Sequence, residues 1–349
     1  MKHMKKITAL LVALVLVLGF SGCGRLQIEK ELLSFNGEMV STAEYNYYLE
    51  NIKSQMLTEA AATDEAAFWN GEIDGKKATD VAKERALAEL IRIEIACAKA
   101  GEKGISLDSS VSAQIKQMVT KPEGDSKTQI DNIKSMTGLS DQGMISLLEK
   151  TELAAKYAQD LMVSEADKLA VTDKAIEEKY QADYSLVKHI LVLSQQQTAE
   201  GEEQMDAEEF KTQQKARAEE VLAKVKAGGN FEALLKEYGE DPGMEQQPEG
   251  YMLDSSGYDV VSKGTMVSEF TKGAFSIAVG QTTELVETPY GWHILKRYKL
   301  PTSGEAYDAA TQTVKGLLMQ DKYNALIDSY KPDYDIQFDK KDIDGIKVY

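Results

Sequence analysis

The segment LVKHILVL at residues 186–193 decides how the middle of this 349-residue chain folds. Its run of branched apolar side chains is typical of a β-strand buried on both faces. A second segment, PYGWHILKR at residues 289–297, repeats the same His-Ile-Leu frame. The two segments carry His189 and His293, which are the only histidines after residue 3. We therefore expect the first and last strands of one compact unit to pair side by side and to bring the two imidazoles together.

Between these two strands, helical and strand patterns alternate. An acidic loop at 195–209 precedes an amphipathic helix, which the two glycines at 228–229 should end. Asn230 is placed to cap the helix that follows, FEALLKEYG. The segment MVSEFTKGAF at 266–275 predicts another short helix, and a turn at 289–291 should join the last two strands. The middle of the chain is therefore expected to be a mixed unit of helices around a sheet.

The segments on either side of this unit are predominantly helical. The pair Asn36-Gly37 predicts a hairpin, and residues 41–44 read as a capping box that opens a helix. From there to residue 183 the apolar spacing is almost wholly helical. A late helix at 305–330 carries an apolar stripe that we expect to cover the N-terminal helices, which would make the mixed unit an insertion. The stripe consists of Val314, Leu317, Leu318, Tyr323 and Leu326.

The first 22 residues have the layout of a secretory signal peptide. Three lysines precede an apolar run from Ile7 to Phe20, which is too short for a comfortable membrane span. The sequence FSGC at residues 20–23 resembles a bacterial lipobox, although Phe20 stands where leucine is usual. That resemblance implies that Cys23 becomes the lipidated N-terminus after cleavage. Two acyl chains would give stable anchoring at the membrane surface.

Composition narrows the classes of function. Hydrophobic content of 43% and charged content of 28% fit a globular protein. Removing residues 1–22 deletes three lysines and no acid, so the formal charge of −17 becomes −20. Such a charge argues against binding nucleic acid and favours cationic or neutral polypeptide partners. Cys97 is expected in a helical core without a disulfide partner, and two histidines without further ligand spacing do not predict a metal site.

In the middle unit the chain resembles the parvulin-type (PpiC, or rotamase) peptidyl-prolyl cis-trans isomerases. The resemblance rests on KHILV, then GGNFEALLKEYGEDPG at 228–243, then the segment from Gly264 through YGWHILK. The whole chain resembles the PrsA-type foldase lipoproteins, which are exported by Gram-positive bacteria. The implied fold is α+β: a four-stranded antiparallel sheet with surrounding helices, inserted into a mainly helical SurA/PrsA-like chaperone domain.

This resemblance assigns roles to individual residues. His189 and His293 take the places of the two parvulin histidines, and Asp241 falls where the family has cysteine or aspartate facing the reacting peptide bond. These three are the expected catalytic residues, and five further residues are expected at the substrate. They are the pocket residues Met266, Phe270 and Met252, and the hydroxyl residues Thr288 and Tyr290, which the family links to its histidine network.

The chemistry that the resemblance implies needs no cofactor and no covalent nucleophile. Rotation about an X-Pro bond faces a barrier of about 18–20 kcal/mol because twisting destroys amide resonance. A pocket that binds the twisted amide better than either planar isomer lowers that barrier. The family's GGDLG appears here as EGYML at 249–253, with extra residues between Met252 and Met266, so the loop beside the pocket differs. The acidic loop at 195–209 lacks the basic cluster that phosphate recognition requires.

The expected organisation has five parts: signal peptide 1–22, lipidated tether 23–33, helical chaperone part 34–183, isomerase domain 184–300, and returning helix and tail 301–349. The favoured function is an isomerase and foldase that assists newly secreted, X-Pro-containing polypeptides outside the cytoplasmic membrane. An alternative is a holdase chaperone with a weak or inactive isomerase domain. A solute-binding lipoprotein is disfavoured because the two closing α/β lobes are missing. Apolar stripes on the helical part would favour a homodimer.

Overall fold

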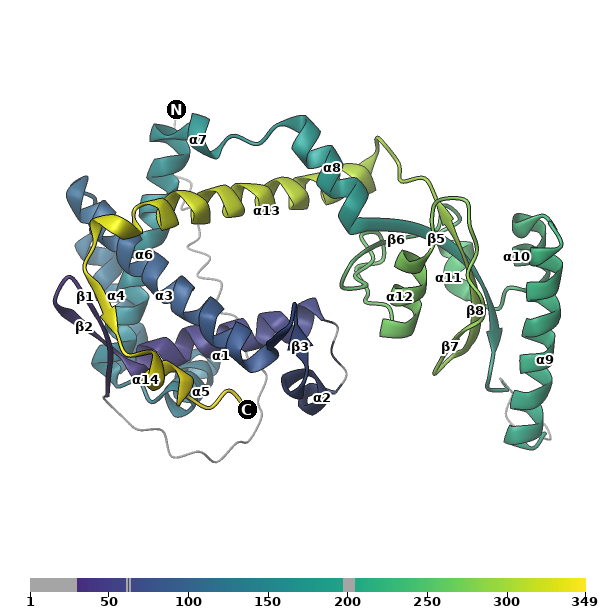
Figure 1. Cartoon of the computed structure of the whole chain (residues 1–349), viewed down its shortest axis with the longest axis horizontal. Helices are drawn as coiled ribbons and strands as arrows, with labels where there is room; N and C mark the ends of the chain where they lie inside the picture. Colours follow the sequence, from purple (N-terminus) through teal and green to yellow (C-terminus); the bar gives the residue numbers. More distant parts are fainter. Residues whose placement is uncertain (1–29, 61, 63, 197–204) are drawn as a thin grey trace. The chain divides into compact units, whose positions relative to one another are not determined.

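The computed structural model describes residues 30–60, 62, 64–196 and 205–349 (Figure 1). The signal peptide and Cys23 lie outside the described residues, as does most of the acidic loop. The described chain divides into two compact units. The helical unit takes in the residues up to Leu57, those from Thr63 to Ala170, and Met319–Tyr349. The insert unit comprises Val171–Leu318 together with the short stretch Thr58–Ala62.

The helical unit begins with the expected hairpin. Strands β1 (Glu31–Phe35) and β2 (Glu38–Ser41) pair antiparallel, and β9 (Ile336–Phe338) pairs with the other edge of β1. The turn holds Asn36 and Gly37 at φ values of 51° and 84°, the left-handed pair that a two-residue hairpin requires. The Ser41 hydroxyl accepts the backbone N–H of Glu44 at 3.1 Å, so half of the predicted capping box is present. The Glu44 carboxylate instead binds Lys150, at 3.0 Å and 3.2 Å.

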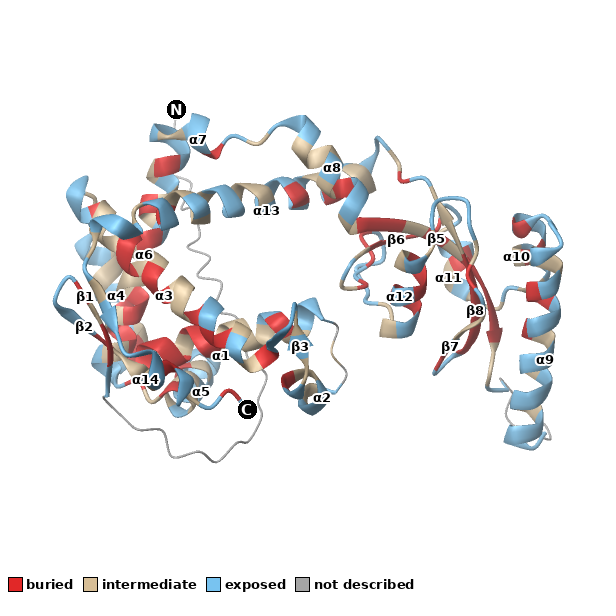
Figure 2. Cartoon of the chain, viewed as in Figure 1, coloured by how far each residue is buried: buried red, intermediate tan, exposed pale blue. Residues whose placement is uncertain are grey.

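Helices make up the rest of the helical unit. Figure 2 shows their buried residues concentrated along facing sides, as the 3.6-residue spacing predicts. None of the helices among the described residues is long and apolar enough to span a membrane. The elements are α1 (Thr42–Glu59), α2 (Glu65–Asn70), β3 (Glu72–Ile73), β4 (Lys76–Lys77), α3 (Ala78–Glu102), α4 (Ser109–Thr120), α5 (Gly124–Thr137), α6 (Asp141–Ser164), α7 (Ala166–Leu169), the end of α13 (Glu305–Ser329), the 3₁₀ turn Lys331–Asp333 and α14 (Lys340–Asp344).

The insert unit contains the predicted four-stranded antiparallel sheet, in the order β6-β5-β8-β7. Its strands are β5 (Tyr184–Leu193), β6 (Tyr251–Asp254), β7 (Val286–Thr288) and β8 (Gly291–Tyr298). The first and last strands, β5 and β8, are neighbours, which confirms the expected pairing. In their register His189 faces Leu295, and Leu191 faces His293. Because strand residues alternate between faces, both histidines lie diagonally on one face of the sheet.

Helices cover both faces of this sheet. Helices α9 (Ala207–Lys226) and α10 (Phe231–Tyr238) pack against the face that carries Ile190 and Ile294. Helix α12 (Ser268–Ser276) packs against the opposite face, which carries the histidines, and buries Phe270 there. The insert unit also contains α8 (Asp173–Asp183) and α11 (Pro242–Gln246). The sheet is therefore a rigid platform under any site on the α12 side.

The apolar stripe of α13 has two partners rather than the single one expected. Tyr323 and Leu326 pack on the core of the helical unit, as predicted. Val314 and Leu318 belong instead to a cluster of the insert unit around Tyr180, and Leu317 is half exposed. The expectation failed because Tyr180 on α8 is completely buried and supplies an apolar partner that the sequence pattern did not reveal.

Candidate functional site

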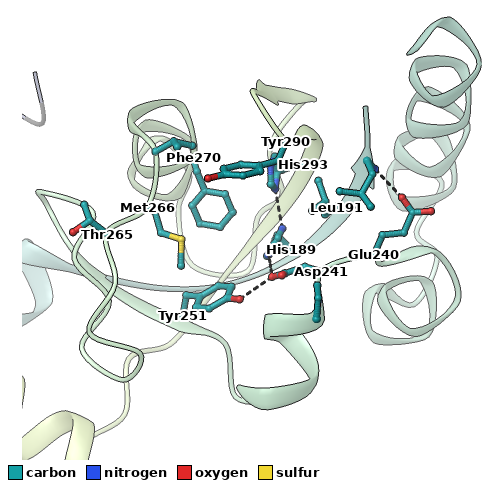
Figure 3. A pocket seen from close by; sticks show the side chains of 13 residues that line it. His189, Leu191, Glu240, Asp241, Tyr251, Thr265, Met266, Phe270, Tyr290 and His293 are labelled. Atoms are coloured by element: carbon teal, nitrogen blue, oxygen red, sulfur yellow. Dashed lines mark hydrogen bonds and ion pairs between the residues drawn. The ribbon is translucent and has the colours of Figure 1, made fainter. Parts of the chain in front are cut away.

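The two histidines are in direct contact on the α12 face of the sheet. Nδ1 of His293 lies 3.0 Å from Nδ1 of His189, and both side chains are almost fully buried. Nε2 of His189 lies 2.8 Å from a carboxylate oxygen of Asp241 (Figure 3). On the far side, Nε2 of His293 lies 2.8 Å from the Thr288 hydroxyl. The predicted contact between His189 and His293 is confirmed. Asp241 and Thr288 extend it into a line of hydrogen-bonded side chains in the order Asp241, His189, His293, Thr288, which we call the row.

Asp241 occupies the N-cap of the short helix α11 and is held as an ionised carboxylate. One of its oxygens accepts the backbone N–H of Gly243 at 3.0 Å, and the other accepts the Tyr251 hydroxyl at 2.7 Å. Burial alone would raise the pKa of Asp241, but the hydrogen bonds from His189 and Tyr251 outweigh it and lower this pKa to about 2. Asp241 therefore caps α11 with one carboxylate oxygen and binds His189 and Tyr251 with the other.

The ionised carboxylate fixes the direction of every hydrogen bond in the row. A carboxylate can only accept, so Nε2 of His189 carries a hydrogen and its Nδ1 is an acceptor when the ring is neutral. His293 then donates from Nδ1 and accepts the Thr288 hydroxyl at Nε2. Burial, together with the adjacent His189, lowers the pKa of His293 to about 3, in keeping with a neutral ring. All four ring nitrogens are therefore engaged within the protein.

The two hydroxyl residues expected near the histidines play different parts. The Thr288 hydroxyl bonds to His293 directly and also accepts the backbone N–H of Tyr290 at 3.2 Å. Tyr290 is therefore linked to the row through its backbone. Its side chain is 60% exposed and lines the cleft described next, so the expected link through the phenol hydroxyl is wrong. The reason is local: the turn between β7 and β8 directs this side chain outward.

An apolar cleft of about 360 Å³ opens beside the row. Phe270 forms its base, with its ring edge-on to His189 at 4.9 Å between centroids and to His293 at 5.3 Å. This volume is at the lower end of the range for small-ligand pockets and suits one small ring and its flanking peptide groups. We call it the central cleft; it is lined by His189, Leu191, Leu193, Glu240, Asp241, Pro242, Tyr251, Thr265, Met266, Val267, Phe270, Tyr290 and His293.

Two expectations about the pocket methionines are corrected. Met252 does not line the central cleft; it is 1% exposed and packs with Tyr180 and Tyr184 on the other side of β6. Because strand residues alternate, its neighbour Tyr251 points into the cleft in its place. Met266 does line the cleft, but it precedes α12, which begins at Ser268, so it does not share a helix with Phe270.

Sequence reasoning missed Tyr251, Glu240 and Thr265. The two-residue period of YMLD would have identified Tyr251, since Leu253 shares its face and is fully buried under α12. Glu240 gave no signal in the sequence, because its role depends on tertiary contacts. Its carboxylate accepts the backbone N–H of Leu193 at 2.7 Å and forms an ion pair with Arg217.

The loop at residues 254–265, which departs from the family pattern, is held in place by hydrogen bonds. Asp259 is completely buried, and its two carboxylate oxygens accept the backbone N–H groups of Met252 at 3.0 Å and Ser262 at 2.8 Å. The loop then returns to the cleft, where the backbone N–H of Met266 donates to the carbonyl of Gly257 at 2.9 Å. The altered loop thus supports a wall of the central cleft.

Within the described residues, no group of three or more histidine, cysteine, aspartate or glutamate side chains is arranged to hold a metal ion. Cys97 is half-buried, and its thiol contacts the Lys150 carbonyl at 3.3 Å. Burial raises the pKa of this thiol to about 12, so it is not a nucleophile at neutral pH.

The buried row predicts that the insert unit loses stability as the pH falls below 6.5. The pKa of His293 is 6.5 in an unfolded chain and about 3 in the fold, so between these values only the unfolded chain takes up a proton there. The free energy of unfolding should fall by about 1 kcal/mol per pH unit over this range. Asp241 adds to the loss below pH 3.8, because its pKa in the fold is about 2.

Urea unfolding at pH 7, 5.5 and 4.5 measures this slope in a Trp69→Phe background, in which fluorescence of Trp292 is the probe of the insert unit. His293→Gln should be less stable at pH 7 but should lose less stability on acidification than the parent chain. An identical slope in both proteins would show that His293 is not the responsible group.

The chain is similar in sequence to known proteins, both in its middle part and over most of its length. Residues 172–298 match the family model of the PPIC-type PPIase domain. The foldase protein PrsA of Caldanaerobacter subterraneus subsp. tengcongensis is 28% identical over 327 residues, which cover 90% of each chain. Foldase protein PrsA 3 of Bacillus anthracis is 29% identical over 203 residues, covering 56% of this chain and 62% of that protein.

Solved structures of proteins named PrsA are also similar to this chain, at low sequence identity. A peptidylprolyl isomerase (PrsA) from Bacillus anthracis is 21% identical, with 70% of this chain and 96% of that chain covered and a TM-score of 0.27. A second one, from Bacillus cereus, is 18% identical, with 90% and 96% covered and a TM-score of 0.31.

Proposed function

The chain is a PrsA-like foldase whose residues 172–298 are a PPIC-type peptidyl-prolyl cis-trans isomerase domain, and we propose that the central cleft is where it rotates X-Pro bonds of client polypeptides. The observation that carries this proposal is the contact between the apolar residues of the central cleft and the row. Phe270 lies edge-on to both imidazoles, and Met266 and Tyr251 line the same cleft. A proline ring bound in the central cleft would place the amide that precedes it beside Asp241.

The cleft favours the twisted amide for an electrostatic reason. A planar amide is a resonance hybrid with negative charge on oxygen, and twisting removes that charge separation. Transfer from water to apolar surroundings therefore costs the planar form more than the twisted form. The ionised Asp241 reinforces this difference, because a negative carboxylate repels the charged carbonyl oxygen of the planar state. Both effects bind the transition state better than the ground state.

The histidines contribute by holding this arrangement. Each ring nitrogen has a partner in the row, so no nitrogen is left to attack the carbonyl or to exchange a proton with the client. The row instead orients Asp241 and keeps the floor of the cleft in one conformation. We therefore assign His189 and His293 as positioning residues, Asp241 as the residue that faces the amide, and Met266 and Phe270 as the grip on the proline.

The test of the function is acceleration of proline-limited reactions by the chain lacking residues 1–23. It should speed the isomerisation of a tetrapeptide with one X-Pro bond and the refolding of a protein limited by such a bond. Faster refolding without faster peptide isomerisation would favour the holdase alternative and contradict catalysis in the cleft.

We also propose that the protein acts outside the cytoplasmic membrane, anchored through lipid on Cys23. The lipobox-like sequence FSGC and the relationship to extracytoplasmic foldases support this location. We propose further that residues 184–300 form the catalytic domain and that 34–183 with 301–349 form a chaperone domain, which would hold clients and could pair as a homodimer. The parent chain should incorporate a labelled fatty acid and the Cys23→Ala variant should not, and equal labelling of the two would contradict the anchor.

A further inference from the structure

Two further hollows adjoin the central cleft, because they share lining residues with it or with each other near helix α11. Glu240, Asp241 and Pro242 line the central cleft and also line a second hollow of about 460 Å³, which includes Met244 and Glu245 of α11. Pro248 lines this second hollow and, in turn, a third hollow of about 550 Å³. We call these the side hollow and the far hollow. All three lie within the insert unit.

The far hollow has the chemistry of a site for apolar side chains. Its walls include Leu186, Pro248, Met252, Val261 and Pro301. Val261 is 51% exposed, so it presents an apolar surface at the rim. Part of the wall comes from residues 299–306, which lie beyond the segment that matches the isomerase family. The far hollow is therefore built in part from residues that follow the isomerase domain in this chain.

A polar feature of the far hollow also fits a peptide. Gln247 is among its lining residues, and the side-chain oxygen of Gln247 is buried without a hydrogen-bond partner in the described part of the chain. An unpaired buried acceptor costs free energy, which a backbone or side-chain N–H of an occupant would recover.

The side hollow between the two is acidic. Its charged lining residues are Glu232, Glu240, Asp241, Glu245 and Lys236. Glu232 is paired with Lys188 and Glu240 with Arg217, so the negative charge of the hollow comes mainly from Asp241 and Glu245. A chain that passes from the central cleft to the far hollow therefore crosses a negative surface. Lysine or arginine is favoured there, and an acidic residue is disfavoured.

We propose that these hollows form one extended groove for the client, in which a proline in the central cleft is flanked on one side by a basic residue over the side hollow and, beyond it, by an apolar residue in the far hollow. The proposal rests on the function assigned above to the central cleft and adds a substrate class to it. The preferred clients are then unfolded chains in which basic and apolar residues flank an X-Pro bond, and a bare X-Pro peptide uses only part of the site.

Three peptides with the same X-Pro core test the groove. One is a tetrapeptide, one is a 15-residue peptide whose flanks contain lysine and leucine, and one has serine and glycine flanks of equal length. Exchange measured by NMR should give the lysine-leucine peptide a kcat/KM about fivefold or more above that of the serine-glycine peptide, as expected for burial of an apolar side chain. Equal values for the two long peptides would overturn the proposal.

Variants locate the effect. Val261→Glu and Ser303→Glu each place a carboxylate in the lining of the far hollow, both at exposed positions. Each should abolish the advantage of the lysine-leucine peptide. Ser303→Glu, which lies outside the loop that supports the central cleft, should also leave the tetrapeptide rate within twofold. The matched control is Val279→Glu, since Val279 is 50% exposed and belongs to none of the three hollows.

The outcomes separate this proposal from the one on which it rests. If the parent chain accelerates no peptide, the assigned function fails. If it accelerates the tetrapeptide but both glutamate variants keep the flank preference, the groove fails and the function stands. Should Val261→Glu also slow the tetrapeptide, because its loop supports the cleft, Ser303→Glu decides between the two.

Discussion

Replacing Asp241 with alanine is expected to lower kcat/KM for X-Pro isomerisation on the order of 10²-fold, the usual effect of removing one preorganised electrostatic group. The change removes the negative charge beside the rotating carbonyl. It also leaves the donors of His189 and Tyr251 without their acceptor, so the row of hydrogen bonds loses its anchor. The tetrapeptide assay measures the loss, and circular dichroism at the assay temperature confirms that the variant is folded.

Two further variants identify the origin of this effect. Asp241→Asn keeps the size of the side chain but removes the charge, so a loss close to that of the alanine variant would assign most of the effect to the charge. Glu219→Ala is the control, because it removes an exposed carboxylate from α9 on the other face of the sheet. An Asp241→Ala protein that retains its structure and isomerises within threefold of the parent chain would refute the electrostatic role.

The second large effect is expected for Gly291→Ala, which should cost about 4 kcal/mol or more of the insert unit's stability. Gly291 begins β8 at a φ of 148°, and an added Cβ would lie 2.1 Å from the carbonyl oxygen of Val192. The next nearest atoms, in Ser194 and Leu193, are also backbone atoms, so no side-chain rotation relieves the clash. The start of β8 must therefore move away from β5, and His293 follows two residues later.

Chemical unfolding followed by fluorescence of Trp292, again in the Trp69→Phe background, gives the size of this loss. Gly280→Ala is the matched control: Gly280 also has a positive φ, of 88°, but nothing lies within 4 Å of an added Cβ. It should cost only the backbone strain of about 1–2 kcal/mol. Equal losses for the two variants would mean that the contact between β5 and β8 is looser than the structure shows.

The sheet and the meeting of the histidines could be predicted because they depend on local patterns. The buried runs of LVKHILVL and GWHILKR define two strands, and their shared frame places both imidazoles at equivalent positions. Helix α5 lies within the segment predicted as almost wholly helical, but its start could not be placed from the sequence, because it has no side-chain cap and opens on Gly124, a poor helix former. The double packing of α13 was missed for a different reason: an apolar stripe shows that a helix is covered, but not by which partner.

A residue of the candidate site could be predicted only where its type and its neighbours in the sequence are enough to place it. Asp241, Phe270 and Thr288 lie where the resemblance put them. Met252 was misplaced by a single step along a strand, which is enough to move a side chain to the opposite face. The direction of the hydrogen bonds could not have been derived from sequence, because it depends on the ionised state of Asp241 and on distances between segments far apart in the chain.

The pairing of β5 with β8 has a consequence for the history of the molecule. Leu186 and Tyr298 are register partners, so the chain enters and leaves this sheet at adjacent positions, about 5 Å apart for neighbouring strands. A gene fragment that encodes such a module can be gained, lost or exchanged at a single point without threading the rest of the polypeptide. The sheet-containing module and the helical unit can therefore change independently of each other.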